Sequence, residues 1–103
     1  MSLRYLFNTS GDYVAFVQGD YVFSPETDWL GFIVNGNEVY ATNGDFMGYL
    51  LSDDRIASRI NEPRRLRLLP PLRPLRPLRP LRPLRRLRML QLPYPYKDVF
   101  EKQ

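Results

Sequence analysis

The sequence predicts an all-β fold: repeated short β-hairpins in a flower-like meander, followed by an extended strip of the polyproline-II type. Two observations predict it. A six-residue pattern rich in aromatic and β-branched residues occurs three times without gaps and is bounded by turn-forming residues. Further along, leucine recurs at every third position from Leu66 to Leu90 with prolines between, and regular proline excludes an α-helix. The 103 residues have room for one small domain and an appendage.

The repeated pattern is Asp, aromatic, aliphatic, small, aromatic, aliphatic, and its copies begin at Asp12, Asp28 and Asp45. A turn and a second short apolar piece follow each copy, so hairpins are predicted near residues 12–23, 28–41 and 45–57. Residues 3–7 add a strand at the start, which gives about seven strands in a meander. Asn35-Gly36 is the clearest turn, because a type I′ turn needs a positive φ at both central positions.

Both faces of these strands are apolar, whereas a half-solvated antiparallel sheet alternates apolar and polar residues. We therefore expect the hairpins to be covered on both sides, by other copies of the chain or by the C-terminal strip. The predicted repeat core consists of the aromatic and small positions of the three copies: Tyr13, Ala15, Phe16, Trp29, Gly31, Phe32, Phe46, Gly48 and Tyr49.

The small central residue of each copy, Ala15, Gly31 or Gly48, indicates close packing at a symmetric centre. The three repeat aspartates could form a ring that binds a cation. We favour a structural role in turns, because two of them directly follow a glycine-containing turn and no dense cluster of oxygen ligands is evident. The sequence predicts no metal and no cofactor.

Charge divides the chain into three parts, although the net charge is only +4. Residues 1–62 form an acidic hairpin module with three basic and nine acidic residues, and residues 63–92 form a strip with ten arginines and no acid. Residues 93–103 are a C-terminal segment, in which the Tyr94-Pro95-Tyr96 cluster is expected to anchor the terminus against the body. This asymmetry indicates a polyanionic partner, or docking of the strip on an acidic surface of this or a neighbouring chain.

The strip contains five perfect Pro-Leu-Arg triplets at residues 71–85. Three residues per polyproline turn place Leu, Arg and Pro on separate ridges, and 25 residues at about 3.1 Å each would make a rod of roughly 75–80 Å. We expect a docked rod rather than a free tail, because a disordered tail has no need of a continuous leucine ridge. Arginines are expected to reach solvent or acids, and leucines are expected to pack against the hairpin aromatics. The packing leucines are Leu69, Leu72, Leu75, Leu78, Leu81, Leu84 and Leu87.

These repeats, followed by triplets with a basic residue and proline, resemble the 4-fold beta flower proteins, a small bacterial family. The resemblance rests on hairpin repeats such as residues 43–50, Asn-Gly-Asp-Phe-Met-Gly-Tyr-Leu, and on the triplets, and covers about residues 3–90. Leucine stands where the family's triplets are expected to carry Ala or Val. The resemblance implies the fold and not an activity, and leaves open whether four petals come from one chain or four.

The chain has no histidine and no cysteine, and its two lysines, Lys97 and Lys102, lie at the end. Because no phosphate-binding loop or nucleophile motif accompanies them, we expect a protein that is not an enzyme. The expected function is a self-associating scaffold or interaction protein in which the strip serves as an assembly strap. A homo-oligomer is expected, with a tetramer as one option. A cytoplasmic location without a membrane span is also expected, because no stretch approaches 20 apolar residues.

Two alternatives remain open. Arginines about 9 Å apart along a polyproline rod could bind RNA, DNA or anionic lipid. The candidate contacts are Arg73, Arg76, Arg79, Arg82 and Arg85. Residues 71–76 also fit the Pro-x-x-Pro-x-Arg pattern of SH3 ligands, although any such triplet array matches by construction.

Overall fold

The computed structural model describes residues 3–101 and confirms the all-β prediction. Eight strands form one antiparallel sheet in which each strand pairs with its neighbour in the sequence. The strands are β1 (Leu3–Phe7), β2 (Tyr13–Gln18), β3 (Tyr21–Phe23), β4 (Trp29–Val34), β5 (Glu38–Ala41), β6 (Phe46–Leu50), β7 (Ile56–Arg59) and β8 (Tyr96–Asp98).

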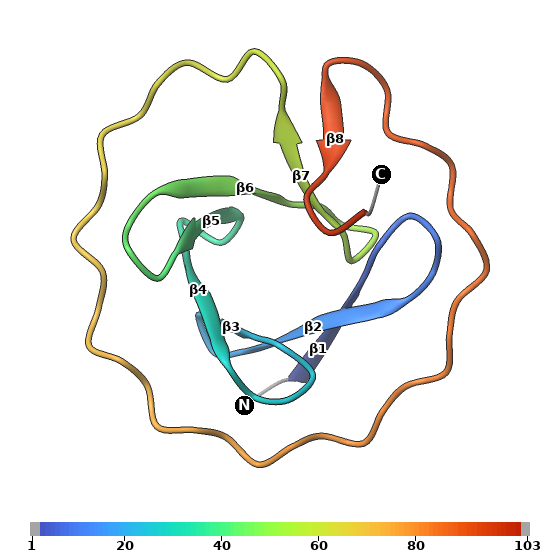
Figure 1. Ribbon diagram of the computed structural model, residues 1–103, viewed down its shortest axis with the longest axis horizontal. Coiled ribbons are helices and arrows are strands. Elements are labelled where there is room, and N and C mark those ends of the chain that lie inside the picture. The colour runs from blue at the N-terminus through green and yellow to red at the C-terminus, as the bar shows by residue number, and fades with distance from the viewer. Residues whose placement is uncertain (1–2, 102–103) are drawn as a thin grey trace.

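The sheet curls into a half-barrel, so the hairpins β2–β3, β4–β5 and β6–β7 lie around a common centre (Figure 1). Each hairpin corresponds to one copy of the repeated pattern, which confirms the three predicted hairpins. The repeated petals therefore come from one chain, with β1 and β8 at the two ends of the strand order.

The turns that connect successive petals share one backbone geometry. In each, an amide donates to the carbonyl four residues later: Asn8 to Asp12, Ser24 to Asp28 and Ala41 to Asp45, at 2.7–3.0 Å. The residue before each aspartate has a left-handed φ, which glycine adopts without strain at Gly11 and Gly44. Within the β4–β5 hairpin, Asn35 and Gly36 both have positive φ, as a type I′ turn requires.

The two faces of the sheet are both apolar, as predicted, and they differ in composition. An aliphatic cluster on one face includes Leu6, Val22, Val39 and Ile56, all of them fully buried. The other cluster is aromatic and consists of Phe7, Tyr13, Phe16 and Phe23, with further rings and Met89 packed against it. A sheet so thin needs cover on the aromatic side, and part of that cover comes from the C-terminal strip.

The small central positions of the repeats lie where neighbouring strands approach each other. A Cβ added at Gly31 would lie 2.2 Å from the carbonyl oxygen of Tyr40, and one at Gly48 would lie 2.6 Å from that of Ala57. Ala15, the equivalent residue of the first copy, is fully buried. Close packing at these positions is therefore required by strand pairing.

Residues 62–93 contain no helix or strand and run around the outside of the sheet, from the end of β7 to the start of β8 (Figure 1). The strip therefore does not project as a rod of roughly 75–80 Å, because the whole molecule measures only 37 × 36 × 22 Å. The strip curves because its two ends belong to paired strands, β7 and β8. Its polyproline II conformation stays a prediction.

The C-terminal segment returns to the body as β8, which the sequence did not predict. Val99 and Phe100 then pack against the aliphatic cluster. Tyr96 belongs to β8, whereas Tyr94 is 81% exposed. The anchoring expected of the Tyr94-Pro95-Tyr96 cluster is thus carried by the strand and by the apolar residues that follow it.

Candidate interaction surface

The strip presents its leucines to solvent. Nine leucines at every third position are 88–94% exposed: Leu66, Leu69, Leu72, Leu75, Leu78, Leu81, Leu84, Leu87 and Leu90. We call this set the leucine ridge. The expectation that these side chains pack against the hairpin aromatics of their own chain is corrected by this arrangement.

Prolines, not leucines, face the sheet. Pro74, Pro77, Pro80 and Pro83 are half-buried, and the residues between them are exposed, so burial along the strip has a period of three. The residue type that turns inward is therefore proline, and not leucine as expected. Proline's compact ring lets the strip backbone lie close to the sheet: the hydroxyl of Tyr5 donates to the carbonyl of Leu81 at 2.7 Å.

The strip is pinned to two of the petal-connecting turns by backbone hydrogen bonds. The amide of Leu68 donates to the carbonyl of Gly44, and the amide of Arg86 donates to that of Gly11, both at 3.0 Å. A Cβ added at either glycine would lie about 2 Å from a strip carbonyl oxygen. The amide of Met89 adds a third bond, to the carbonyl of Thr9 at 2.8 Å. Glycine at these turns therefore serves the docking of the strip as well as the turn itself.

The repeat aspartates pair with strip arginines in a regular register. Arg67 contacts Asp45 at 2.8 Å, Arg76 contacts Asp28 at 2.6 Å, and Arg85 contacts Asp12 at 2.9 Å. The three arginines are nine residues apart, so each petal matches three triplets of the strip. For Asp45 the hydrogen bond from Arg67 lowers the pKa of the carboxyl below its ordinary value.

Two arginines in the inward frame of the strip lie over aromatic rings. The guanidinium of Arg65 stands 4.0 Å from the ring centre of Phe46, and that of Arg86 stands 4.1 Å from the ring centre of Phe7. Arg65 also donates to the hydroxyl of Tyr49 at 2.7 Å. A guanidinium stacked on a ring keeps both its apolar contact and its hydrogen bonds. These two residues hold the two ends of the strip on the aromatic face.

Most of the proposed polyanion contacts are engaged within the chain. Arg76 and Arg85 pair with repeat aspartates, Arg79 approaches Glu26 at 4.0 Å, and Arg82 lies over the Tyr13 ring. Arg73 lines a small surface hollow beside Trp29. Six of the ten strip arginines contact a carboxylate: Arg65, Arg67, Arg76, Arg79, Arg85 and Arg86.

The predicted repeat core lies mostly under this strip or between strands. Tyr13, Ala15, Phe16, Gly31, Phe32 and Gly48 are buried, and Trp29, Phe46 and Tyr49 are half-buried. The strip reaches all three half-buried aromatics, through Arg65 at Phe46 and Tyr49 and through Arg73 and Pro74 near Trp29. It also reaches the buried Tyr13 through Arg82.

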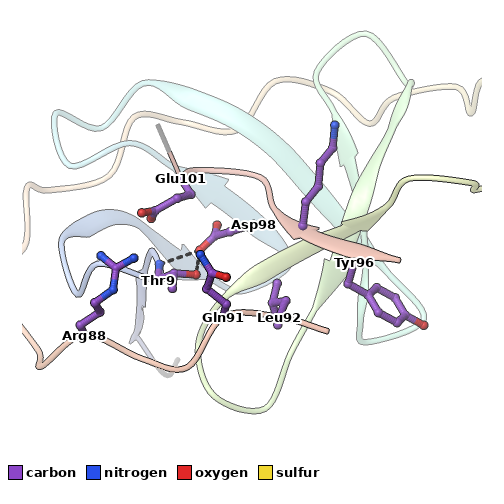
Figure 2. Close-up of a pocket in the computed structure, with 8 residues that line it drawn as sticks. Thr9, Arg88, Gln91, Leu92, Tyr96, Asp98 and Glu101 are labelled. Atoms are coloured by element: carbon purple, nitrogen blue, oxygen red, sulfur yellow. Dashed lines mark hydrogen bonds between the residues drawn. The ribbon is translucent and has the colours of Figure 1, made fainter. Parts of the chain in front are cut away.

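A pocket of about 210 Å³ lies where the C-terminal segment meets the β1–β2 turn (Figure 2). Its carboxylates already have partners. Asp98 accepts from the amide of Thr9 at 2.6 Å and from its hydroxyl at 2.7 Å, and Glu101 accepts from the hydroxyl of Ser10 at 2.6 Å. In Figure 2 the ring of Tyr96 points away from these groups. The carboxylates of this pocket therefore serve to attach the C-terminal segment to the β1–β2 turn.

The side chains and elements of residues 3–101 also bear on two other kinds of site. Across these residues no group of three or more His, Cys, Asp or Glu side chains is placed to hold a metal ion. The same residues contain no helix that is long and apolar enough to cross a membrane.

The profile of the family described as 4-fold beta flower protein matches residues 4–56. The chain belongs to this family. Neither a curated protein nor a solved structure gives a match. The family match covers β1 to the start of β7, so the strip of this 4-fold beta flower protein lies outside the matched residues.

Sequence reasoning missed the residues that hold the strip, although the sequence carried a signal for them. Leu68, Arg86 and Met89 occupy the frame in which Pro74 to Pro83 stand, so each is a place where the expected proline is absent. Proline has no amide hydrogen, and these three residues are the ones whose amides bond to the petal turns. Breaks in the proline frame therefore mark the docking points.

Proposed function

We propose that this 4-fold beta flower protein is a non-enzymatic interaction protein that self-associates, with the strip docked on its own hairpins as an assembly strap. The observation that carries the proposal is the leucine ridge, in which nine large apolar side chains are almost fully exposed on a strip that is fixed to the body. Monomeric proteins rarely keep such a continuous apolar surface in water, and it is typical of an interaction surface.

Several features support a strap in preference to a loose tail. The strip's backbone is bonded to the turns at Gly11 and Gly44, and its arginines reach the repeat aspartates in register. The absence of histidine and cysteine from the sequence supports a role without acid–base or thiolate catalysis.

The same contacts weaken the alternative of polyanion binding. Phosphate binding by a regular row of arginines depends on positive charge that is not already paired, and six strip arginines contact carboxylates of their own chain. A nucleic acid would have to displace these pairs and approach a hairpin module with a net charge of −6. We therefore place self-association first.

Size-exclusion chromatography with light scattering tests the proposal, combined with limited proteolysis of the strip. The expected result is a mass above that of the 12.2 kDa chain that rises with protein concentration, and a strip that resists cleavage. A 12.2 kDa species at every concentration, with a strip cut at the rate of an unfolded peptide, would overturn the proposal. Gel retardation of a nucleic acid by the protein, falling steeply with salt concentration, would support polyanion binding instead.

A further inference from the structure

We propose that the leucine ridge is a polyvalent contact surface, on which separate arcs receive separate further copies of this chain. The inference rests on the proposed function and adds to it the kind of assembly. It predicts open-ended association in place of a single closed dimer.

The path of the ridge supports polyvalency. The strip runs around the periphery of a molecule measuring 37 × 36 × 22 Å, from the end of β7 to the start of β8 (Figure 1). The nine leucines of the ridge, from Leu66 to Leu90, are at least 88% exposed along this path. A rigid neighbour that approaches the rim from one side contacts only the arc of the ridge that faces it, so the remaining leucines stay available for other neighbours.

The repetitive sequence of the strip makes its arcs interchangeable. Residues 71–85 are five identical Pro-Leu-Arg triplets, so the contact surface at Leu72 has the same chemistry as that at Leu84. A contact that can form at one triplet can form at the next. Contacts that do not use one unique patch need not close, and contacts that do not close give extended assemblies.

A second copy is the partner that this surface fits. Its own ridge repeats with the same period of three residues, so the leucines of one ridge can lie between those of the other along the length of the contact. Arginines beside the leucines would repel each other, but Arg76 and Arg85 are neutralised by their own aspartates at 2.6 and 2.9 Å. This pairing lowers the repulsion between two ridges and weakens the attraction of an anionic partner.

Two matched variants of the full chain test the inference: Leu72→Ser with Leu75→Ser, and Leu81→Ser with Leu84→Ser. Each pair changes two identical triplets and serves as the control for the other. Because all four side chains are exposed, the melting temperature of the single-chain state should stay within about 2 °C of the parent in each variant. Sedimentation velocity over a range of concentrations measures the association.

We expect the parent to grow in mass with concentration without reaching a fixed stoichiometry. Each double variant should weaken association by about tenfold and to a similar extent, and the four-serine variant should weaken it further than either. An oligomer of fixed size, or loss of association in one double variant with none in the other, would overturn the inference in favour of a single patch.

Other outcomes separate the inference from the function on which it rests. Association that all the serine variants retain would overturn the ridge as the interface and leave self-association standing. A parent that stays monomeric at every concentration would overturn the proposed function as well. Ridge-dependent binding to phosphatidylcholine vesicles by a monomeric parent would assign the leucines to a lipid surface and overturn the inference.

Discussion

Replacing Gly44 by alanine tests whether the petal turns hold the strip. Gly44 has a φ of 94°, and an added Cβ would lie 1.9 Å from the carbonyl oxygen of Leu68. That oxygen belongs to the strip backbone, so the strip has to move away. Gly36→Ala is the matched control, because Gly36 has a φ of 81° and nothing lies within 4 Å of its added Cβ.

The two substitutions share the backbone strain and differ in the effect on the strip. A left-handed alanine costs about 1–2 kcal/mol of the free energy of unfolding in either variant. Gly44→Ala additionally breaks the bond from the Leu68 amide to the Gly44 carbonyl, which contributes about 0.5–1.5 kcal/mol. We therefore expect Gly44→Ala to lower stability by about 1 kcal/mol more than the control.

Urea denaturation measures the stability difference, and limited proteolysis of the native protein measures strip docking. Gly44→Ala should accelerate cleavage within residues 62–70, and Gly36→Ala should leave that rate at the parent's value. Equal losses of stability with unchanged cleavage in both variants would show that the turn does not hold the strip, and the reasoning would fail.

Two further predictions concern charged side chains that hold the strip on the sheet. Burial of the Asp54 carboxyl opposes its ionisation, but hydrogen bonds from Arg4 and Arg86 outweigh burial and hold its pKa below the ordinary value. The contribution of the Asp54 carboxylate to stability is therefore present above about pH 4 and is lost as the pH falls through the lowered pKa. The difference in melting temperature between the parent and Asp54→Asn should shrink between about pH 7 and pH 2. A difference that stays constant over this range would contradict the prediction. Arg65→Lys removes the stacking on Phe46 and should lower the free energy of unfolding, measured by urea denaturation, by about 1–2 kcal/mol. Arg64→Lys, at an exposed position, is the control and should change it little. Equal effects of the two substitutions would contradict a stabilising role for the stacking.

The hairpins were predictable because their signals are local. Short segments of aromatic and aliphatic residues next to a turn such as Asn35-Gly36 predict a hairpin from local sequence alone, and the three copies support one another. β8 was not predictable on this basis. Its three residues, Tyr96, Lys97 and Asp98, become a strand through pairing with β7, which no local pattern reveals.

The orientation of the strip was predicted wrongly for a physical reason. Hydrophobicity alone places leucine inward, since its burial contributes more than that of proline. Orientation is instead set by how closely the strip backbone approaches the turns at Gly11 and Gly44 and by the reach of the arginines to the repeat aspartates. Neither constraint is visible until the turns and the strip are placed in space.

The proline frame connects the two halves of the chain. Proline fixes the backbone of the strip in an extended form but provides no amide hydrogen. A strip of unbroken triplets would therefore have nothing in that frame to donate to the petal turns. Leu68, Arg86 and Met89 interrupt the frame where the carbonyls of Gly44, Gly11 and Thr9 accept a bond, and between them the triplets run without a break. The strip is thus built as a stiff span fastened near both ends. Because the fastening uses backbone and arginine, the leucines are left free for contacts outside the chain.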